Sequence, residues 1–197
     1  LGRGALAMNT MDRQVLARTR SATSVITDSA AAATAIACGE KTYNHGMGVD
    51  KDGKRLTSCA EVAKANGRKV GIVTTVTIDH ATPSGFYAHR KDRGESYAIG
   101  LDMIASGFDL FAGGGQSRPD DRKNALYKGD LYDLAAKAGY TVIREDRAAF
   151  EAVRKEPKEK VNLSYEINNP INQAYWKADY PAVTEIFETF AGINYLK

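Results

Sequence analysis

Apolar positions between residues 21 and 157 switch repeatedly between spacings typical of strands and spacings typical of helices. The continuous apolar run "RKVGIVTTVT" (68–77) predicts a strand buried on both faces of a parallel sheet. "FDLFAGGG" (108–115) and "YTVIRE" (140–145) predict two more strands, and β-branched "SATSVITD" (21–28) predicts a fourth. Because these segments alternate with helical ones, we expect an α/β fold, with three layers (α/β/α) around a mainly parallel central sheet.

The predicted helices carry local start and stop signals. Ser58 and Asp146 are expected to cap helices at their N-termini, and glycines at 39, 67 and 107 are natural C-terminal stops. Pro83 is expected in the first turn of its helix. The predicted helical segments are 29–39, 59–67, 83–90, 95–107, 129–139 and 146–156.

Composition changes near residue 161. The last 37 residues hold seven of the 17 aromatic residues, with two basic and four acidic residues. We therefore divide the chain into an α/β domain portion (1–160) and an aromatic-rich C-terminal segment (161–197) that includes a short amphipathic helix, "AVTEIFETFAG". Exposing many aromatic side chains to solvent is unfavourable in free energy. We therefore expect this segment to cover a domain edge or to form an oligomer contact such as a homodimer.

Charge excludes some partners. The formal net charge is +3, and no block of Lys and Arg forms a phosphate-tracking patch, so we expect no nucleic-acid partner. No apolar run approaches the roughly 18 residues of a membrane span. The chain has two cysteines, Cys38 and Cys59, so at most one disulfide can form within it. The alternative is two independent thiols.

The stretch "ITDSAAAATAIACG" (26–39) puts Ser29 just after the residues expected to cap a helix, Thr27 or Asp28. Unpaired backbone N–H groups and the helix dipole favour an anion at such a position. A serine hydroxyl there can act as a nucleophile, but only once a base or a metal activates it. Taken alone, the stretch favours an ordinary capped helix that packs closely through its alanines.

A second stretch, "TIDHATPSGFYAHRKDR" (77–93), follows the strand at 68–77, at the sheet edge where α/β proteins bind ligands. The Arg93 guanidinium offers a planar fork for two phosphate oxygens. His80 and Thr82, two residues apart, can both face an ion or its bound water. These residues also have ordinary interpretations, Thr82 as a helix cap and Arg93 as a solvated charge. His89 lies in the same stretch, and for it we favour a position on a helix surface.

Three blocks in order resemble the alkaline phosphatase family: "TDSAAAATAIACGEKTYN", "DHATPSGFYAHRKDR" and "FDLFAGGG". The resemblance covers about residues 17–160. It implies that Ser29 is the nucleophile that becomes phosphorylated, with its oxygen on zinc, and that Arg93 binds the substrate by clamping two phosphate oxygens. It also implies that Asp28 helps to orient Arg93.

The resemblance further implies two Zn²⁺ ions and one Mg²⁺ ion. Thr82 would supply an oxygen to magnesium, and His80 would lie just outside that ion's direct ligands. Cys38 and Cys59 fall where animal members place a disulfide, which agrees with a periplasmic or extracellular protein. The implied substrate is a small phosphomonoester, hydrolysed through a phosphoserine.

The ligand set is incomplete in this chain. The family's Gly-Asp-Gly-like opening motif is absent, and none of the three histidines follows Arg93. The alternative function is therefore a metal-free, non-catalytic phosphate-binding or scaffold module derived from the same fold. A phosphodiesterase ranks lower because Arg93 suits a terminal phosphate, and a nucleotide site at "AGGGQS" is weakest because its glycines do not make G-x-G-x-x-G.

Overall fold

The computed structural model describes residues 11–13, 17–156 and 158–164, and within them a four-stranded sheet forms the centre. All three strand pairings are parallel, and the strand order is β1-β2-β4-β3. The strands are β1 (Gly71–Val73), β2 (Leu110–Gly113), β3 (Thr141–Arg144) and β4 (Val161–Ser164). The predicted parallel α/β architecture is confirmed.

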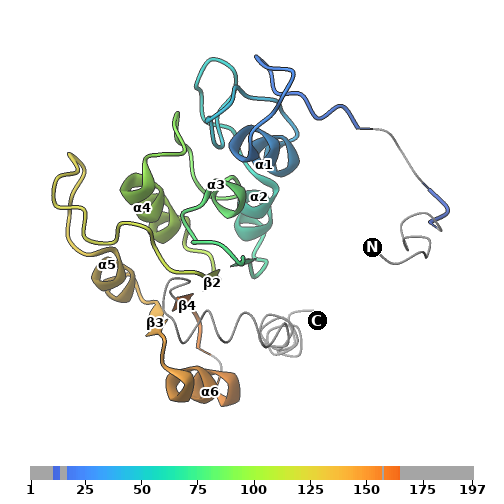
Figure 1. Cartoon of the computed structure of the whole chain (residues 1–197). Helices are drawn as coiled ribbons and strands as arrows, with labels where there is room; N and C mark the ends of the chain where they lie inside the picture. The colour runs from blue at the N-terminus through green and yellow to red at the C-terminus, as the bar shows by residue number, and fades with distance from the viewer. Residues whose placement is uncertain (1–10, 14–16, 157, 165–197) are drawn as a thin grey trace, which may run out of the picture.

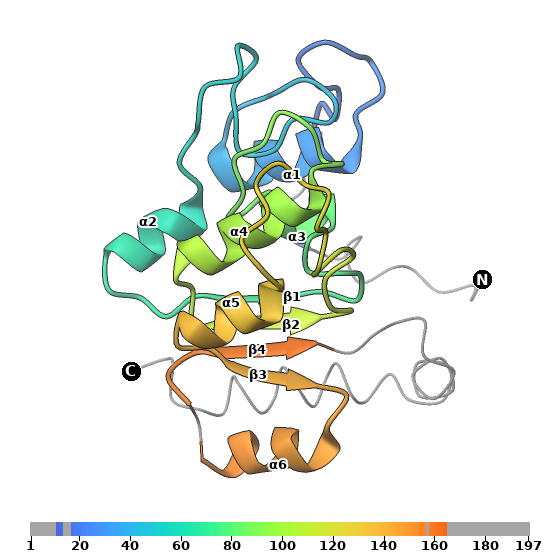
Figure 2. The same ribbon diagram turned by 90° about the vertical axis from the view of Figure 1, so that its left-hand side faces the viewer.

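Helices lie on both faces of this sheet (Figure 1). Figure 2 shows α6 on one side of the strands and the other helices on the opposite side, with α1 farther from the sheet than α4. The three-layer arrangement is therefore confirmed. The helices are α1 (Ser29–Cys38), α2 (Cys59–Ala65), α3 (Ala81–Ser84), α4 (Ser96–Ser106), α5 (Leu131–Lys137) and α6 (Arg147–Lys155).

Alternate residues of the central strands face two separate apolar clusters, as the pleat of a strand requires. On β2, Phe111 belongs to the larger cluster, on the side of α4 and α5, and stacks with Phe108 at a ring-centroid distance of 6.0 Å. Its neighbours Leu110 and Ala112 belong to the smaller cluster, with Phe150 of α6. The sheet is thus buried on both faces, which is what fixes the register of its strands.

Most predicted helix ends are confirmed. The side chain of Ser58 accepts from the N–H of Glu61, whose carboxylate in turn accepts from the N–H of Ser58, so the two residues form a capping box at α2. Asp146 caps α6, and Gly39 and Gly107 end α1 and α4 in the left-handed conformation. Capping hydrogen bonds form within one turn of chain, so these helix ends do not depend on distant parts of the fold.

Three local predictions are wrong in detail. Residues 21–28 form bends and irregular backbone rather than a strand, and no strand in the described part of the sheet pairs with them. Val25 and Ile26 are accordingly 86% and 79% exposed. The strand at 68–77 shortens to β1, which is partly exposed because it lies at the edge of the described sheet. The helix expected at 83–90 is α3, which begins earlier, at Ala81, and spans one turn.

The boundary expected at residue 160 also needs correction. Residues 161–164 form β4, which pairs with β2 on one side and β3 on the other, so they belong to the sheet and not to a separate segment. The rest of the expected C-terminal segment, with its helix, lies outside the described residues. Among the helices that the structure describes, none has the length and apolar character needed to cross a membrane.

Replacing Leu163 by alanine is expected to lower the free energy of unfolding by about 2–5 kcal/mol, because the side chain is fully buried in β4 at the middle of the sheet. Urea unfolding followed by circular dichroism measures the loss. Leu126→Ala is the matched control, since Leu126 is 44% exposed, and it should change stability by no more than about 0.5 kcal/mol. Equal losses from the two variants would contradict the central place of β4.

Candidate active site

Ser29 is the first residue of α1, directly after its N-cap. Asp28 has extended backbone (φ −95°, ψ 175°), and its Oδ1 accepts from the N–H of Ala31 at 3.0 Å. The first N–H groups of a helix lack acceptors within the helix, so α1 presents donors and a positive dipole end beside the Ser29 hydroxyl.

The alanines of α1 have a packing role of their own. Ala30, Ala31, Ala33 and Ala37 are buried, and α1 packs on α3. A Cβ at Gly85, just after α3, would lie 2.6 Å from the Cβ of Ala33, so the two segments meet at the closest approach that small residues allow. Close packing through the alanines therefore leaves Ser29 free at the N-terminus of the same helix, so the two interpretations of the sequence are compatible.

Arg93 joins the predicted site residues. Its Nη1 donates to Ser29 Oγ at 3.1 Å and to Asp28 Oδ2 at 3.3 Å. Its Nη2 lies 3.4 Å from Nε2 of His80. Residues 28, 29, 80 and 93 are thus brought together from α1, from the N-cap of α3 and from the loop before α4.

Thr82, the predicted magnesium ligand, lies in α3 two residues after His80, and it is exposed. Within the described residues no hydrogen bond links its side chain to Ser29 or Arg93. The structure therefore places Thr82 beside the cluster rather than in it.

Both ionisable neighbours of Arg93 have shifted pKa values. Burial acts to raise the pKa of Asp28, but N–H bonds from Ala31 and His45 together with the Arg93 guanidinium bring it below the ordinary 3.8. The pKa of His80 is lowered from 6.5, first by burial and then by the Arg93 cation, against the opposing effect of Asp79. Near neutral pH the site therefore holds a carboxylate, a guanidinium and a neutral imidazole.

The tautomer of His80 follows from its partner. A guanidinium only donates, so Nε2 of His80 accepts from Arg93 and the ring proton is on Nδ1. Nδ1 is buried and has no hydrogen-bond partner among the described residues. A buried donor without an acceptor is costly, so this N–H is a buried side-chain group of the cluster that still needs a partner.

Two residues of the site were not identified from the sequence. Asn44 accepts from the N–H of Asp28 through Oδ1 at 3.3 Å, and the backbone N–H of His45 donates to Asp28 Oδ2 at 3.1 Å. The backbone carbonyl of His45 accepts from the N–H of Arg93 at 2.9 Å. Backbone contacts such as those of His45 leave no signal in the sequence.

His89 is not the solvated helix residue that the sequence favoured. It follows α3, its side chain is 13% exposed, and its ring lies between the carbonyl of Gly48 and Oε1 of Glu61, each at 2.9 Å. These contacts connect α2 to the loop that carries His45, and they lie apart from the Ser29 cluster.

The metal ions implied by the resemblance need more ligands than this cluster holds. No group of three or more His, Cys, Asp and Glu side chains comes together in residues 11–13, 17–156 and 158–164. Two zinc ions require a set of histidine and carboxylate ligands, so the described residues do not fit a zinc pair. A single Thr82 hydroxyl with His80 behind it is likewise too little for magnesium, which takes several oxygen ligands.

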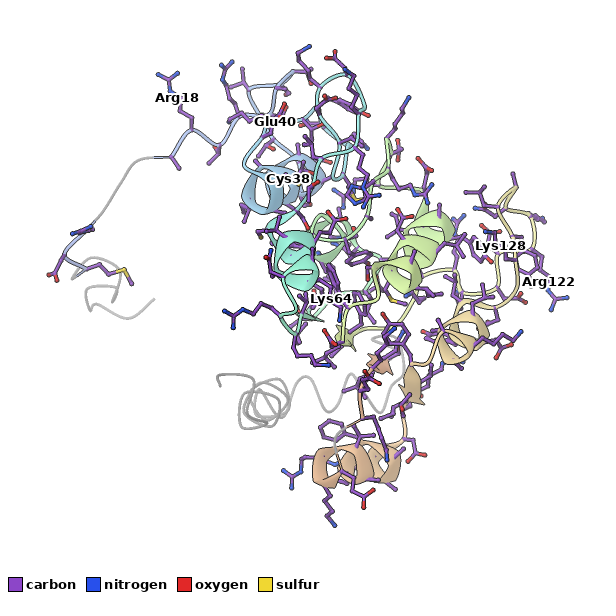
Figure 3. All side chains as sticks on the ribbon, turned by 180° about the vertical axis from the view of Figure 1, so that it is seen from behind. Arg18, Cys38, Glu40, Lys64, Arg122 and Lys128 are labelled. Atoms are coloured by element: carbon purple, nitrogen blue, oxygen red, sulfur yellow. The ribbon has the colours of Figure 1, made fainter. Side chains whose placement is uncertain are left out.

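The two cysteines are free thiols in this structure, Cys38 half-buried and Cys59 exposed, so the implied disulfide is not formed here. Burial, followed by the nearby charges of Glu61, Cys59 and Glu40, raises the pKa of Cys38 to about 11. Figure 3 shows Cys38 on α1, on the side of the molecule away from Arg122 and Lys128. The pairing of the two thiols stays a prediction.

A serine at a helix N-terminus beside a guanidinium is an arrangement suited to phosphate groups. A model of the alkaline phosphatase family matches residues 3–152, so the chain belongs to that family.

Individual relatives agree with this assignment. Alkaline phosphatase 4 of Bacillus subtilis is 38% identical over 134 residues, which are 62% of this chain. The repressible alkaline phosphatase of Saccharomyces cerevisiae is 35% identical over 163 residues, or 75% of this chain. These two matches cover 27% and 29% of the relatives' own lengths, so the chain spans less than a third of either enzyme.

Solved structures match in fold as well. Alkaline phosphatase from the Antarctic bacterium TAB5 aligns with a TM-score of 0.67 and 35% identity, over 76% of this chain and 42% of that one. The Thermus thermophilus enzyme aligns with a TM-score of 0.70 and 30% identity, over 87% of this chain and 36% of that one. One variant of the TAB5 enzyme is described with magnesium bound in its M3 site.

Replacing Asp28 by asparagine tests the electrostatics of the cap. Asparagine also caps helices but carries no charge, so the variant should be less stable at pH 7 by about 1–2 kcal/mol through weaker bonds to Arg93 and the two N–H groups. Because the folded pKa of Asp28 is depressed, its contribution is complete above about pH 4 and is lost as the pH falls through the folded pKa.

Urea unfolding of both proteins between pH 7 and pH 3 measures this difference. Asp52→Asn is the control, since Asp52 is an exposed carboxylate paired with its neighbour Lys51. A stability difference between wild type and Asp28→Asn that stays constant down to pH 3 would contradict the assignment.

Proposed function

We propose that this chain carries the phosphate-accepting part of an enzyme that hydrolyses small phosphomonoesters through a phosphoserine at Ser29. The observation that carries the proposal is the 3.1 Å contact between Arg93 Nη1 and Ser29 Oγ at the N-terminus of α1. It puts a nucleophilic oxygen, a cation and free helix N–H groups around one point. A phosphoryl group at that point would meet a nucleophile and donors for its oxygens, which are two of the requirements for its transfer.

In this proposal Arg93 binds two non-bridging oxygens of the substrate, and the N-terminus of α1 accepts part of the remaining negative charge. Ser29 Oγ forms a bond to phosphorus, the bond from phosphorus to the ester oxygen breaks, and the leaving alcohol takes up a proton. Water then attacks the phosphoserine, which releases inorganic phosphate and restores the hydroxyl. The guanidinium and the helix dipole both favour the alkoxide form of Ser29.

Asp28 and His80 keep the guanidinium in place. Asp28 Oδ2 accepts from Nη1, and His80 Nε2 accepts from Nη2, so the fork is held from two sides before substrate arrives. Such preorganisation lowers the cost of binding and of charge development. Arg93 offers donors to oxygens that only a terminal phosphate leaves free, which favours a monoester over a diester.

For the complete protein we propose two Zn²⁺ ions and one Mg²⁺ ion, in line with the family and with the magnesium in the TAB5 variant. Their ligands would come from outside the described residues, and we derive no step through them. A periplasmic or extracellular location is proposed on the resemblance, and a homodimer on the aromatic-rich C-terminal sequence.

A second candidate is a metal-free phosphate-binding module. The lack of any described group of three metal-ligating side chains favours it for the chain taken alone. Calorimetric titration with inorganic phosphate, with and without EDTA, separates the two candidates. Binding that EDTA leaves unchanged, with no hydrolysis of p-nitrophenyl phosphate in added zinc and magnesium, supports the module.

Ser29→Ala is expected to abolish covalent labelling. Wild-type protein incubated with p-nitrophenyl phosphate in zinc and magnesium, then quenched in acid, should carry one phosphoryl group on the peptide that contains Ser29. Ser106→Ala, at the far end of α4, is the matched control and should label normally. A label that persists in Ser29→Ala would show that another residue is the nucleophile.

Arg93→Lys should weaken the binding of inorganic phosphate on the order of 10- to 100-fold, because a lysine cannot present two parallel donors. Isothermal titration calorimetry measures this change. Arg122→Lys is the control: Arg122 is exposed and lies on the loop between β2 and α5, away from α1 (Figure 3). Equal affinity in wild type and Arg93→Lys would rule out the clamp.

A further inference from the structure

The turn that contains His45 has an unusual backbone. His45 has a φ of +76°, and Glu145 is the one other non-glycine residue with positive φ in the described ranges. The N–H of Gly46 donates to the carbonyl of Tyr43 at 3.1 Å, which closes a four-residue turn with His45 in its third position. Positive φ at that position is the mark of a type II turn, where glycine is usual and a side chain is strained.

Both backbone groups of His45 are used by the Ser29 site. Its N–H donates to Asp28 Oδ2 at 3.1 Å, and its carbonyl accepts from the N–H of Arg93 at 2.9 Å. The same Asp28 oxygen accepts from Arg93 Nη1. One turn residue therefore joins the carboxylate that orients the guanidinium to the backbone from which the guanidinium extends.

The turn is itself held to α1. The hydroxyl of Thr34, in the second turn of the helix, donates to the carbonyl of Gly46 at 3.3 Å and accepts from the N–H of Gly48 at 3.0 Å. Asn44 Nδ2 donates to the carbonyl of Ile26 at 3.0 Å, and its Oδ1 accepts from the N–H of Asp28. Four hydrogen bonds therefore connect the turn to α1 and to the residues just before it.

The turn is also held to the segment that leads to Arg93. Met47 and Arg90 exchange two backbone hydrogen bonds of 2.9 Å each, as a short antiparallel bridge. Gly48 (φ +57°) admits no side chain here, because a Cβ would lie 2.2 Å from the carbonyl oxygen of Ala88. Residues 44–48 therefore fix the separation between α1 and the stretch before Arg93.

We propose that His45 is a positioning residue, whose left-handed backbone sets the Arg93 guanidinium against Ser29. This inference rests on the proposed function, since it concerns the same phosphate site. The imidazole of His45 is exposed, and the contacts that carry the argument come from the backbone. Any residue that adopts positive φ easily should therefore replace His45 without loss, whereas a β-branched residue should not.

The test compares His45→Gly and His45→Val with wild type by two measurements. Calorimetry gives the dissociation constant for inorganic phosphate, and amide hydrogen exchange gives the protection of the Arg93 N–H without any ligand. We expect His45→Gly to keep the phosphate affinity within about twofold, and His45→Val to weaken it about tenfold and to lower the protection of the Arg93 amide. If the valine variant does not fold, His45→Ala takes its place, since alanine adopts positive φ less readily than histidine and has no β-branch.

Glu145→Val is the matched control, because it puts the same residue at the other positive φ (+52°), between β3 and α6. It should lower thermal stability but leave phosphate affinity and Arg93 protection unchanged. If it weakens phosphate binding as much as His45→Val does, general destabilisation explains the effect and the proposal fails. An equal loss in His45→Gly and His45→Val would also overturn it, because the imidazole would then be the active group.

The two measurements separate this inference from the proposed function. If wild-type protein binds no phosphate, the phosphate site is refuted and the exchange measurement alone decides the role of His45. Loss of Arg93 protection in His45→Val, restored in His45→Gly, then supports positioning. Unchanged protection in His45→Val refutes it whatever the phosphate result.

Discussion

The guanidinium of Arg93 is the group on which the arrangement of the site depends. Its charge lies partly buried, where it needs acceptors, and it finds them on Ser29, Asp28 and His80. Two separate segments, residues 28–29 and the N-cap of α3, supply these acceptors, and Arg93 lies on a third, so the cation can be satisfied only when all three are in register. The site and the local fold are therefore stabilised by the same contacts, and a change that displaces any one segment leaves a buried charge short of partners.

The parallel sheet and the small residues of α1 bring these segments together. The chain that leaves β1 at its carboxyl end runs directly to His80 and α3, and α3 packs on α1 closely because Ala33 and Gly85 have so little side chain. The loop 44–48 then closes the arrangement, since it is bonded both to α1 through Thr34 and to the Arg93 segment through Met47. Each connection is short, and little freedom remains for the hydroxyl relative to the guanidinium.

The sequence predicted what depends on local chemistry and missed what depends on distant partners. The caps at Ser58 and Asp146 act within one turn, so the helices they begin were predicted correctly. A strand was expected at 21–28 because Val25 and Ile26 favour one, yet a strand needs a neighbour, which the described sheet does not offer. The resemblance to a family pattern predicted four site residues by their side chains: Asp28, Ser29, His80 and Arg93. His45 contributes through its backbone N–H and carbonyl, and the identity of a side chain does not predict such contacts.

In the described residues, the hydrogen-bond donors around Ser29 are in place, but the cluster has too little positive charge to attract a phosphate strongly. The Arg93 cation is already offset by Asp28, whose pKa is depressed, and His80 is neutral, so the cluster itself has almost no net positive charge. The N-terminus of α1 adds about half an elementary charge. A phosphate dianion would therefore find correctly placed donors but only a weak attractive field. The chain holds Ser29 and Arg93 in position through its own hydrogen bonds, and the described residues do not supply the strong positive potential that the proposed phosphoryl transfer would require.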